Sequence, residues 1–227
     1  MNKEVIADFY QKFEPDIKST TINWRIHTLV KIGVLNRIAK GKFVWNKTQN
    51  YNYEVSSKMK SIHTKLKKEF PYLTICFWDT IMLNEFMVHQ VAKSYLLVEV
   101  EKEALLTVFY FLKENINLPV FVQPNQDVID KYVPNDKQII IIKPLISEAP
   151  LHTAKGINLA SLEKILVDIF CDEVIFSAYQ GSEMPTIFTE ILNKYTLNQS
   201  RMLRYAARRG KRSRIKEYLL TVTNLEQ

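Results

Sequence analysis

The sequence predicts a mixed α+β protein, in which an N-terminal winged helix-turn-helix precedes an α/β domain that ends in basic helices. Three observations indicate this class. Residues 1–50 hold two helical patterns and a short hairpin, strand and helix patterns alternate over 70–145, and helical patterns fill the chain from 158 onward. The length of 227 residues suffices for two domains, which we expect at 1–50 and 55–227.

The first two helices are indicated by apolar spacing and by a proline. Residues 4–13 carry apolar side chains at helical intervals, and Pro15 ends this helix. A second helix is expected to begin near Ser19 or Thr20, either of which can cap its first turn. One face of this helix forms a stripe for burial, made of Ile22, Ile26, Leu29 and Val30.

A basic hairpin is predicted at residues 34–45, with its turn at Lys40-Gly41. In a winged helix-turn-helix the second helix enters the major groove of DNA, and such a hairpin contacts the phosphate backbone. Trp24 lies off the apolar stripe and is interpreted as a core residue rather than a backbone contact. The residues predicted to contact DNA are Thr20, Thr21, Asn23, Arg25, Thr28, Lys31, Arg37, Lys40 and Lys42.

The middle of the chain predicts an α/β layer after a linker. Residues 46–55 are polar and rich in Asn and Tyr, so they are interpreted as the linker. A basic amphipathic helix follows at 55–70. Further helices are expected from about 80 and at 101–115, and strands are expected at 72–78, 94–100, 118–123 and 138–145.

The C-terminal part is predicted to be helical and strongly basic. Helical patterns cover 158–172, 182–195 and 198–222, the last as one helix or as two helices broken at Gly210. Four arginines fall at steps of three or four, so they can form one cationic stripe: Arg201, Arg204, Arg208 and Arg212. With Arg209, these residues complete the predicted DNA contacts.

The charge distribution supports a polyanionic partner. The net charge is +7, with nine Lys/Arg against four Asp/Glu in residues 1–50, and eight against none in 201–216. Residues 51–200 are slightly acidic. Such basic zones attract polyanions, most commonly nucleic acid. A solvated basic surface without a partner is the alternative.

The composition excludes several other classes of protein. Hydrophobic residues make up 47% and charged residues 24%, which is typical of a globular chain. The longest dense apolar run, residues 104–112, is much shorter than the roughly 20 residues of a membrane helix. The N-terminus lacks the pattern of a secretion signal, and Cys76 and Cys171 form neither a disulfide framework nor a metal motif. We therefore expect a cytoplasmic protein without a membrane segment.

The sequence contains no familiar catalytic motif, so neither an enzyme nor a cofactor nor a metal site is expected. A phosphate-binding glycine loop, a nucleophile elbow, an HExxH pair and a CxxC pair are all missing from it. Three acids after a strand leave a metal-dependent nuclease or nucleotidyltransferase-like enzyme as an alternative: Glu99, Glu101 and Glu103. A second alternative is a protein-interaction module with a basic docking tail. Lys164 and its neighbours Glu163 and Asp168 are interpreted as a structural ion pair.

Three segments resemble AbiE-type antitoxins, which belong to bacterial abortive-infection toxin–antitoxin systems. Residues 19–45 are similar to the start of these proteins, through Gly33-Val34-Leu35 and Lys40-Gly41-Lys42-Phe43. Residues 157–170 resemble their C-terminal domain, and the basic segment 197–212 resembles their closing helices. The residues that carry the second likeness are Ser161, Glu163, Lys164, Leu166 and Asp168.

The resemblance implies a transcriptional autoregulator that binds double-stranded DNA at inverted repeats in its own promoter. It also implies an antitoxin that neutralises a nucleotidyltransferase-type toxin without forming a stable complex. The N-terminal helix would read DNA, and the C-terminal domain would supply the antitoxin activity. Residues 70–145 are richer in strands than the family pattern, which leaves a diverged relative with a different partner open.

Overall fold

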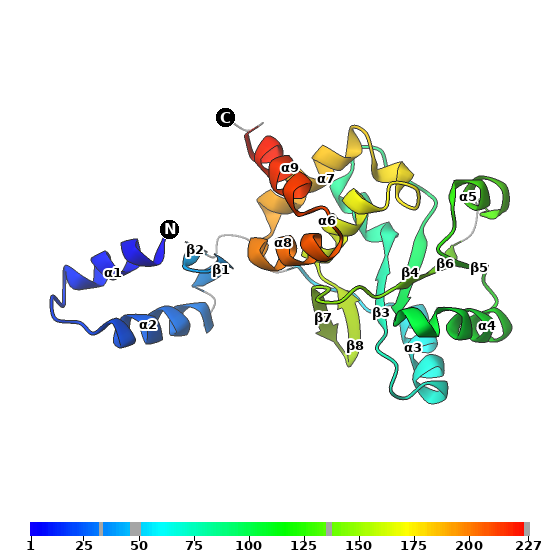
Figure 1. Ribbon diagram of the computed structural model, residues 1–227, viewed down its shortest axis with the longest axis horizontal. Helices are drawn as coiled ribbons and strands as arrows, with labels where there is room; N and C mark the ends of the chain where they lie inside the picture. The colour runs from blue at the N-terminus through cyan, green and yellow to red at the C-terminus, as the bar shows by residue number, and fades with distance from the viewer. Residues whose placement is uncertain (32–33, 46–50, 135–137, 225–227) are drawn as a thin grey trace.

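The computed structural model describes residues 1–31, 34–45, 51–134 and 138–224. An N-terminal unit lies at one end of the molecule, and a larger α/β part forms the rest (Figure 1). The predicted mixed α+β class is confirmed. Among the described residues, no helix has the length and apolar character needed to cross a membrane.

The N-terminal unit consists of two helices and a hairpin at the predicted positions. Its elements are α1 (Lys3–Gln11), α2 (Ser19–Lys31), β1 (Leu35–Ala39) and β2 (Lys42–Trp45). The two strands are antiparallel, and Gly41 takes the positive φ of 71° that their tight turn requires. The backbone of Met1 exchanges two hydrogen bonds of 2.9 Å with that of Phe43, so the chain start is fixed beside β2.

Five apolar side chains form the small core of this unit, namely Ile6, Ile22, Ile26, Leu35 and Phe43. The interpretation of Trp24 as a core residue is wrong, because 66% of its surface is exposed. The side of α2 that faces the hairpin is formed by Ile22 and Ile26, which share a core with Leu35 and Phe43. An indole on another side of the helix therefore remains in solvent.

The larger part contains one mixed sheet of six strands in the order β5-β6-β4-β3-β8-β7. Its strands are β3 (Cys76–Asp79), β4 (Tyr95–Val100), β5 (Val120–Val122), β6 (Ile139–Pro144), β7 (Leu151–Ala154) and β8 (Ile157–Ala160). Strand β6 is parallel to β4 and β5, and β3 is parallel to β8. The pairs β3–β4 and β7–β8 are antiparallel.

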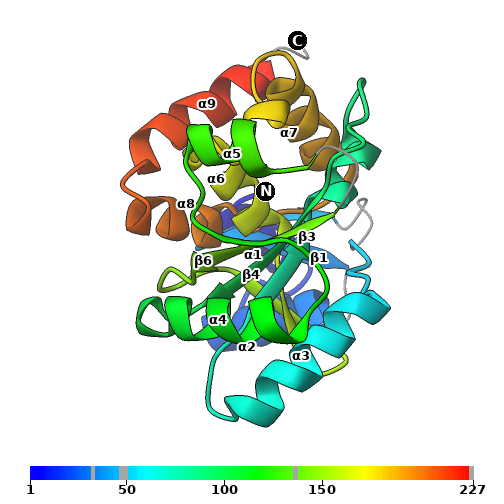
Figure 2. The ribbon, with the colours of Figure 1, turned by 90° about the vertical axis from the view of Figure 1, so that its right-hand side faces the viewer.

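Helices cover both faces of this sheet (Figure 2). The first face is covered by α3 (Ser57–Glu69) and α4 (Leu105–Asn115), which share one apolar core with it. The second face is covered by α5 (Gln126–Tyr132), α6 (Leu162–Cys171), α7 (Glu183–Lys194), α8 (Gln199–Arg208) and α9 (Arg212–Asn224). Three short 3-10 helices complete the fold: η1 (Thr80–Phe86), η2 (Lys102–Ala104) and η3 (Ser177–Tyr179).

Two details of the predicted layout are corrected, and one open alternative is decided. Residues 158–160, predicted as helix, belong to β8, because Lys155 and Gly156 both have positive φ and turn the chain back onto β7. Of the predicted linker, residues 46–50 lie outside the described residues, whereas Tyr51 and Tyr53 pack against the core. The C-terminal helical segment is divided at Gly210, in agreement with the two-helix alternative.

A network of buried charges joins the sheet to the helices of its second face. The Lys164 ammonium group is fully buried, donates to Glu99 on β4 at 2.6 Å, and forms an ion pair with Asp168 one turn along α6. Asp168 also accepts hydrogen bonds from the Tyr205 hydroxyl at 2.8 Å and from Arg209 at 2.9 Å. The predicted structural ion pair of Lys164 with Asp168 is therefore confirmed.

We expect the substitution Lys164→Ala to destabilise the protein strongly. It leaves Glu99 without its cationic partner in a dry interior, and removing one member of a buried pair typically costs about 3–5 kcal/mol. The free energy of unfolding, measured by urea titration with circular dichroism, should fall by that amount. The control Lys216→Ala, at an exposed position of α9, should change it by less than about 0.5 kcal/mol. Equal unfolding midpoints for the two variants would contradict the structural role of Lys164.

Candidate nucleic-acid interface

Helix α2 exposes only part of the surface that the sequence assigned to DNA. Thr20, Asn23 and Lys31 are exposed, whereas Thr21, Arg25 and Thr28 are half-buried. Arg25 donates to the carboxylate of Glu14 at 2.8 Å, and its guanidinium group lies over the Tyr10 ring. Arg25 therefore ties α2 to the preceding part of the unit.

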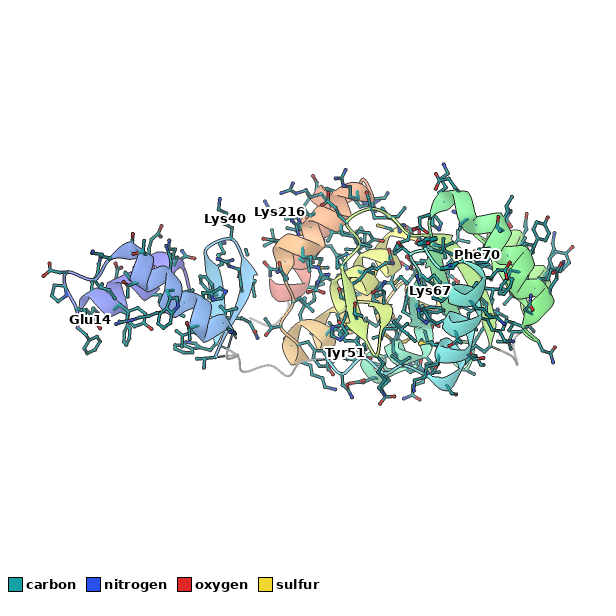
Figure 3. All side chains as sticks on the ribbon, turned by 90° about the horizontal axis from the view of Figure 1, so that it is seen from below. Glu14, Lys40, Tyr51, Lys67, Phe70 and Lys216 are labelled. Atoms are coloured by element: carbon teal, nitrogen blue, oxygen red, sulfur yellow. The ribbon has the colours of Figure 1, made fainter. Side chains whose placement is uncertain are left out.

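The hairpin presents its three predicted cations to solvent. Arg37, Lys40 and Lys42 are all exposed, and Lys40 projects from the turn (Figure 3). The Arg37 guanidinium group lies 5.4 Å from the centre of the buried Phe43 ring. This contact orients Arg37 and leaves its N–H groups available for an anion.

The hairpin and the C-terminal helices enclose a basic cleft, which we call the junction cleft. Its volume is about 520 Å³, and α8 packs against β1 beside it. The lining residues come from β1 and its turn, from the start of α8, and from the start of α9. They are Arg37, Ala39, Lys40, Asn198, Ser200, Leu203, Arg204 and Arg212.

Four of these lining residues are cations, and all four were predicted from the sequence to contact DNA. No carboxylate lines the junction cleft, and within the described residues none of the four cations belongs to an ion pair. Like charges repel each other, so an anion bound between them would be stabilised. The junction cleft is therefore suited to a phosphate group.

The other arginines in α8, and Arg209 just after it, already have partners within the protein. Arg201 donates to the backbone oxygen of Leu151 at 2.7 Å, and the exposed Arg208 pairs with Glu148. Arg209 is half-buried and pairs with Asp168 and Asp172. The expected single stripe of arginines is wrong, because α8 ends at Arg208 and the chain changes direction before α9.

The position of α8 depends on acids of α6. Glu163 is buried, accepts the backbone N–H of Asn198 at 2.9 Å and accepts the Ser161 hydroxyl at 2.6 Å. The Asn198 side chain in turn accepts the N–H of Arg201, which caps the first turn of α8. At the other end of α8, Tyr205 and Arg209 bind Asp168. Both ends of the helix are thus fixed by hydrogen bonds.

The ionisation of this network follows from its burial and its neighbours. Burial opposes the charge on Lys164, but Asp168 and Glu99 together hold its pKa well above the usual value. Burial likewise opposes the charge on Asp168, but Lys164, Lys143 and Arg209 lower its pKa below the usual value. Both groups are therefore charged at neutral pH.

The three acids of the nuclease alternative do not lie together around one point. Glu99 is buried and accepts the indole N–H of Trp78 at 3.2 Å in addition to Lys164. Glu101 instead accepts the backbone N–H of Thr74 at 3.0 Å, and Glu103 is exposed. Within the residues that the structure describes, no group of three His, Cys, Asp or Glu side chains is placed to hold a metal ion.

Comparison with known proteins gives one family match. The model of a family of unknown function, DUF6577, matches residues 21–225, which includes most of α2, the hairpin and the larger part up to the end of α9. No curated protein matches the chain.

We expect acid to remove the contribution of Asp168 to stability. Its folded pKa lies below the unfolded value of about 3.9, so its stabilisation is complete above that value and is lost as pH falls through the folded pKa. The difference in urea midpoint between wild type and Asp168→Asn should therefore be large at pH 7 and shrink near pH 3. The control Glu173→Gln, at an exposed position, should follow wild type at both values. An unchanged difference at the two pH values would contradict the lowered pKa of Asp168.

Proposed function

We propose that this chain, which belongs to the DUF6577 family of unknown function, is a DNA-binding regulator of transcription. The observation that carries the proposal is the junction cleft, where Arg37, Lys40, Arg204 and Arg212 meet without a carboxylate. DNA carries a dense row of phosphates, and neutralising them with Lys and Arg releases bound counterions. A cleft with four unpaired cations is a suitable site for that backbone.

In the proposed binding mode, the N-terminal unit acts as a winged helix-turn-helix. The exposed polar side chains Thr20 and Asn23 of α2 can hydrogen-bond base edges in the major groove. Lys31 and Lys42 are exposed on the same unit and can bind flanking phosphates. The junction cleft adds contacts from α8 and α9, so the N-terminal unit and the larger part would both bind the same DNA backbone.

The structure reduces the set of proposed DNA contacts. Arg25, Arg201 and Arg209 have internal partners, and breaking these contacts to bind DNA would cost stability. Arg208 is exposed, but its charge is already balanced by Glu148. The proposed backbone contacts are therefore Lys31, Lys42 and the four cations of the junction cleft.

The antitoxin activity implied by the resemblance to AbiE-type proteins stays a prediction. The residues that carry the C-terminal likeness include Glu163, Lys164 and Asp168, and these are buried inside the larger part. Their hydrogen bonds hold α8 in place. These residues are therefore needed for the fold. Because they are buried, a toxin could not contact them directly.

We expect single alanine substitutions of Arg37, Lys40 and Arg204 to weaken binding to the DNA upstream of the coding sequence. Each removes about one phosphate contact, so affinity in an electrophoretic mobility shift at moderate salt should fall roughly three- to tenfold. The slope of log affinity against log salt concentration should decrease by about one for each. The matched control Lys60→Ala, at an exposed position of α3 in the larger part, should leave both quantities unchanged.

Two further results decide between DNA and other partners. Asn23→Ala should reduce the preference for upstream DNA over a scrambled duplex while leaving the salt slope unchanged, because a base contact carries sequence information and little charge. If wild type fails to shift either duplex, or if the cleft variants bind as tightly as Lys60→Ala, the proposal is wrong. The basic cleft would then be assigned to an acidic protein partner.

A further inference from the structure

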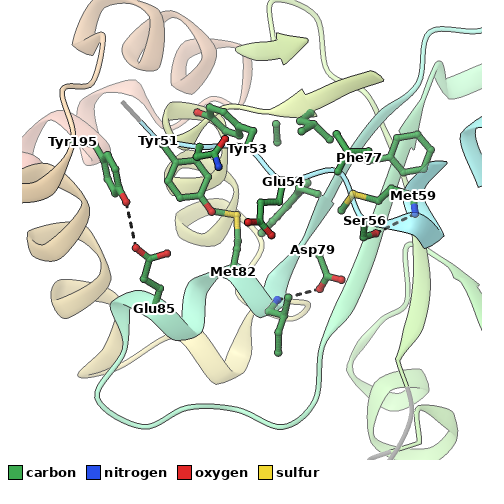
Figure 4. Close-up of a pocket in the computed structure, with 16 residues that line it drawn as sticks. Tyr51, Tyr53, Glu54, Ser56, Met59, Phe77, Asp79, Met82, Glu85 and Tyr195 are labelled. Carbon is green, nitrogen blue, oxygen red and sulfur yellow. Dashed lines mark hydrogen bonds between the residues drawn. The ribbon is translucent and has the colours of Figure 1, made fainter. Parts of the chain in front are cut away.

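A second cavity lies in the larger part, and its lining differs completely from that of the junction cleft. We call it the tyrosine cavity; its volume is about 570 Å³, within the range of small-molecule sites. It is lined by residues 51–56, by Met59 of α3, by β3, η1 and β8, and by Tyr195 after α7 (Figure 4). Its aromatic lining residues are Tyr51, Tyr53, Phe77, Trp78 and Tyr195.

The aromatic rings of the tyrosine cavity meet at right angles. The ring of Tyr51 is tilted by 83° from that of Tyr53, with centroids 4.7 Å apart, and by 90° from that of Tyr195, with centroids 5.2 Å apart. A flat ligand that stacks between two rings requires them to be parallel. Perpendicular rings offer no such slot, and a compact group can instead lie against a single π face.

The charged lining of the tyrosine cavity is entirely negative. Glu54, Asp79 and Glu85 line it, and no Lys, Arg or His does, although the chain as a whole carries a net charge of +7. Glu85 is already paired with Lys194 and accepts the Tyr195 hydroxyl. Glu54 has neither an ion-pair nor a hydrogen-bond partner among the described residues, and it projects into the space beside Met82 (Figure 4).

Asp79 adds a partly desolvated carboxylate to the same cavity. It accepts the backbone N–H of Ile81 at 3.0 Å and a hydrogen bond from the Gln138 amide. Asp79 has no ion pair among the described residues. Burial raises the pKa of Asp79 in spite of these bonds and of the nearby Lys58 ammonium group, which acts to lower it. A cation in the cavity would compensate this lost hydration.

We propose that the tyrosine cavity binds a small organic cation, an alkylated ammonium compound. The ammonium group would lie against the Tyr51 ring, whose π face attracts a cation, and Glu54 would supply its counter-charge. The Lys194 ammonium group already lies 5.4 Å from the centre of the Tyr195 ring, so Tyr195 is left out of the proposed contact. Alkyl substituents would contact the apolar lining around Met82 and Trp78. Anionic ligands are excluded from this site by the three carboxylates. The proposal goes beyond DNA binding and does not depend on it.

The test uses the full chain and choline as the probe, with Trp78 as the reporter. Trp24 and Trp45 are exposed on the N-terminal unit, so the variant Trp24→Phe/Trp45→Phe leaves Trp78 in the cavity as the only tryptophan. Choline should change the Trp78 emission in a saturable manner. Dimethylbutanol, the uncharged carbon isostere of choline, should bind at least about tenfold more weakly, because it has the same shape and no charge.

Substitutions in the same background identify the site. Glu54→Gln and Tyr51→Leu should each raise the choline dissociation constant about tenfold, through loss of the counter-charge and of one π face respectively. The matched controls Glu173→Gln and Tyr72→Leu, at exposed positions elsewhere, should leave it unchanged. The proposal is overturned if choline gives no saturable change, if dimethylbutanol binds equally well, or if neither cavity variant differs from its control.

Discussion

The ammonium group of Lys164 is the point on which the larger part of the structure depends. It is fully removed from water, and an ion in a protein interior is tolerated only with close partners of opposite charge. Glu99 on β4 and Asp168 on α6 supply them, and Asp168 is shared with Tyr205 and Arg209. The sheet, α6 and α8 must therefore be placed so that Glu99 and Asp168 remain in contact with the Lys164 ammonium group.

This constraint extends to the surface. Hydrogen bonds fix α8 at both ends, and Arg204 and the start of this helix line one side of the junction cleft. The hairpin cations Arg37 and Lys40 line the other side. The tyrosine cavity shows the opposite polarity, with three carboxylates and no cation in its lining. The net charge of +7 is thus distributed so that a cleft lined by cations and a cavity lined by carboxylates lie at separate places on one chain.

Local sequence signals were sufficient for most of the fold. The two N-terminal helices and the hairpin have short-range causes, namely apolar spacing and the Lys40-Gly41 turn, and they occur where these signals indicate. The cap expected at Ser19 or Thr20 is not found, because both residues already lie inside α2. The alternating middle segment also gives the expected strands and the helix expected at 101–115, whereas the helix expected from about 80 is the short 3-10 helix η1. Strand β8 was missed because its residues continue the apolar pattern of α6. Strand β8 is recognised in the structure from its pairing with β7. In the sequence, the Lys155-Gly156 dipeptide could have indicated the turn between the two strands.

The sequence by itself determined that the ends of the chain are basic, and that Lys164 and Asp168 lie one helical turn apart. Only the tertiary structure decided which arginines are available to a ligand. Arg204 and Arg209 look equivalent in the sequence, yet one lines the junction cleft and the other is paired with Asp168 and Asp172. The partners of a long side chain are chosen by contacts between distant segments, and the periodicity of a single helix carries no information about them.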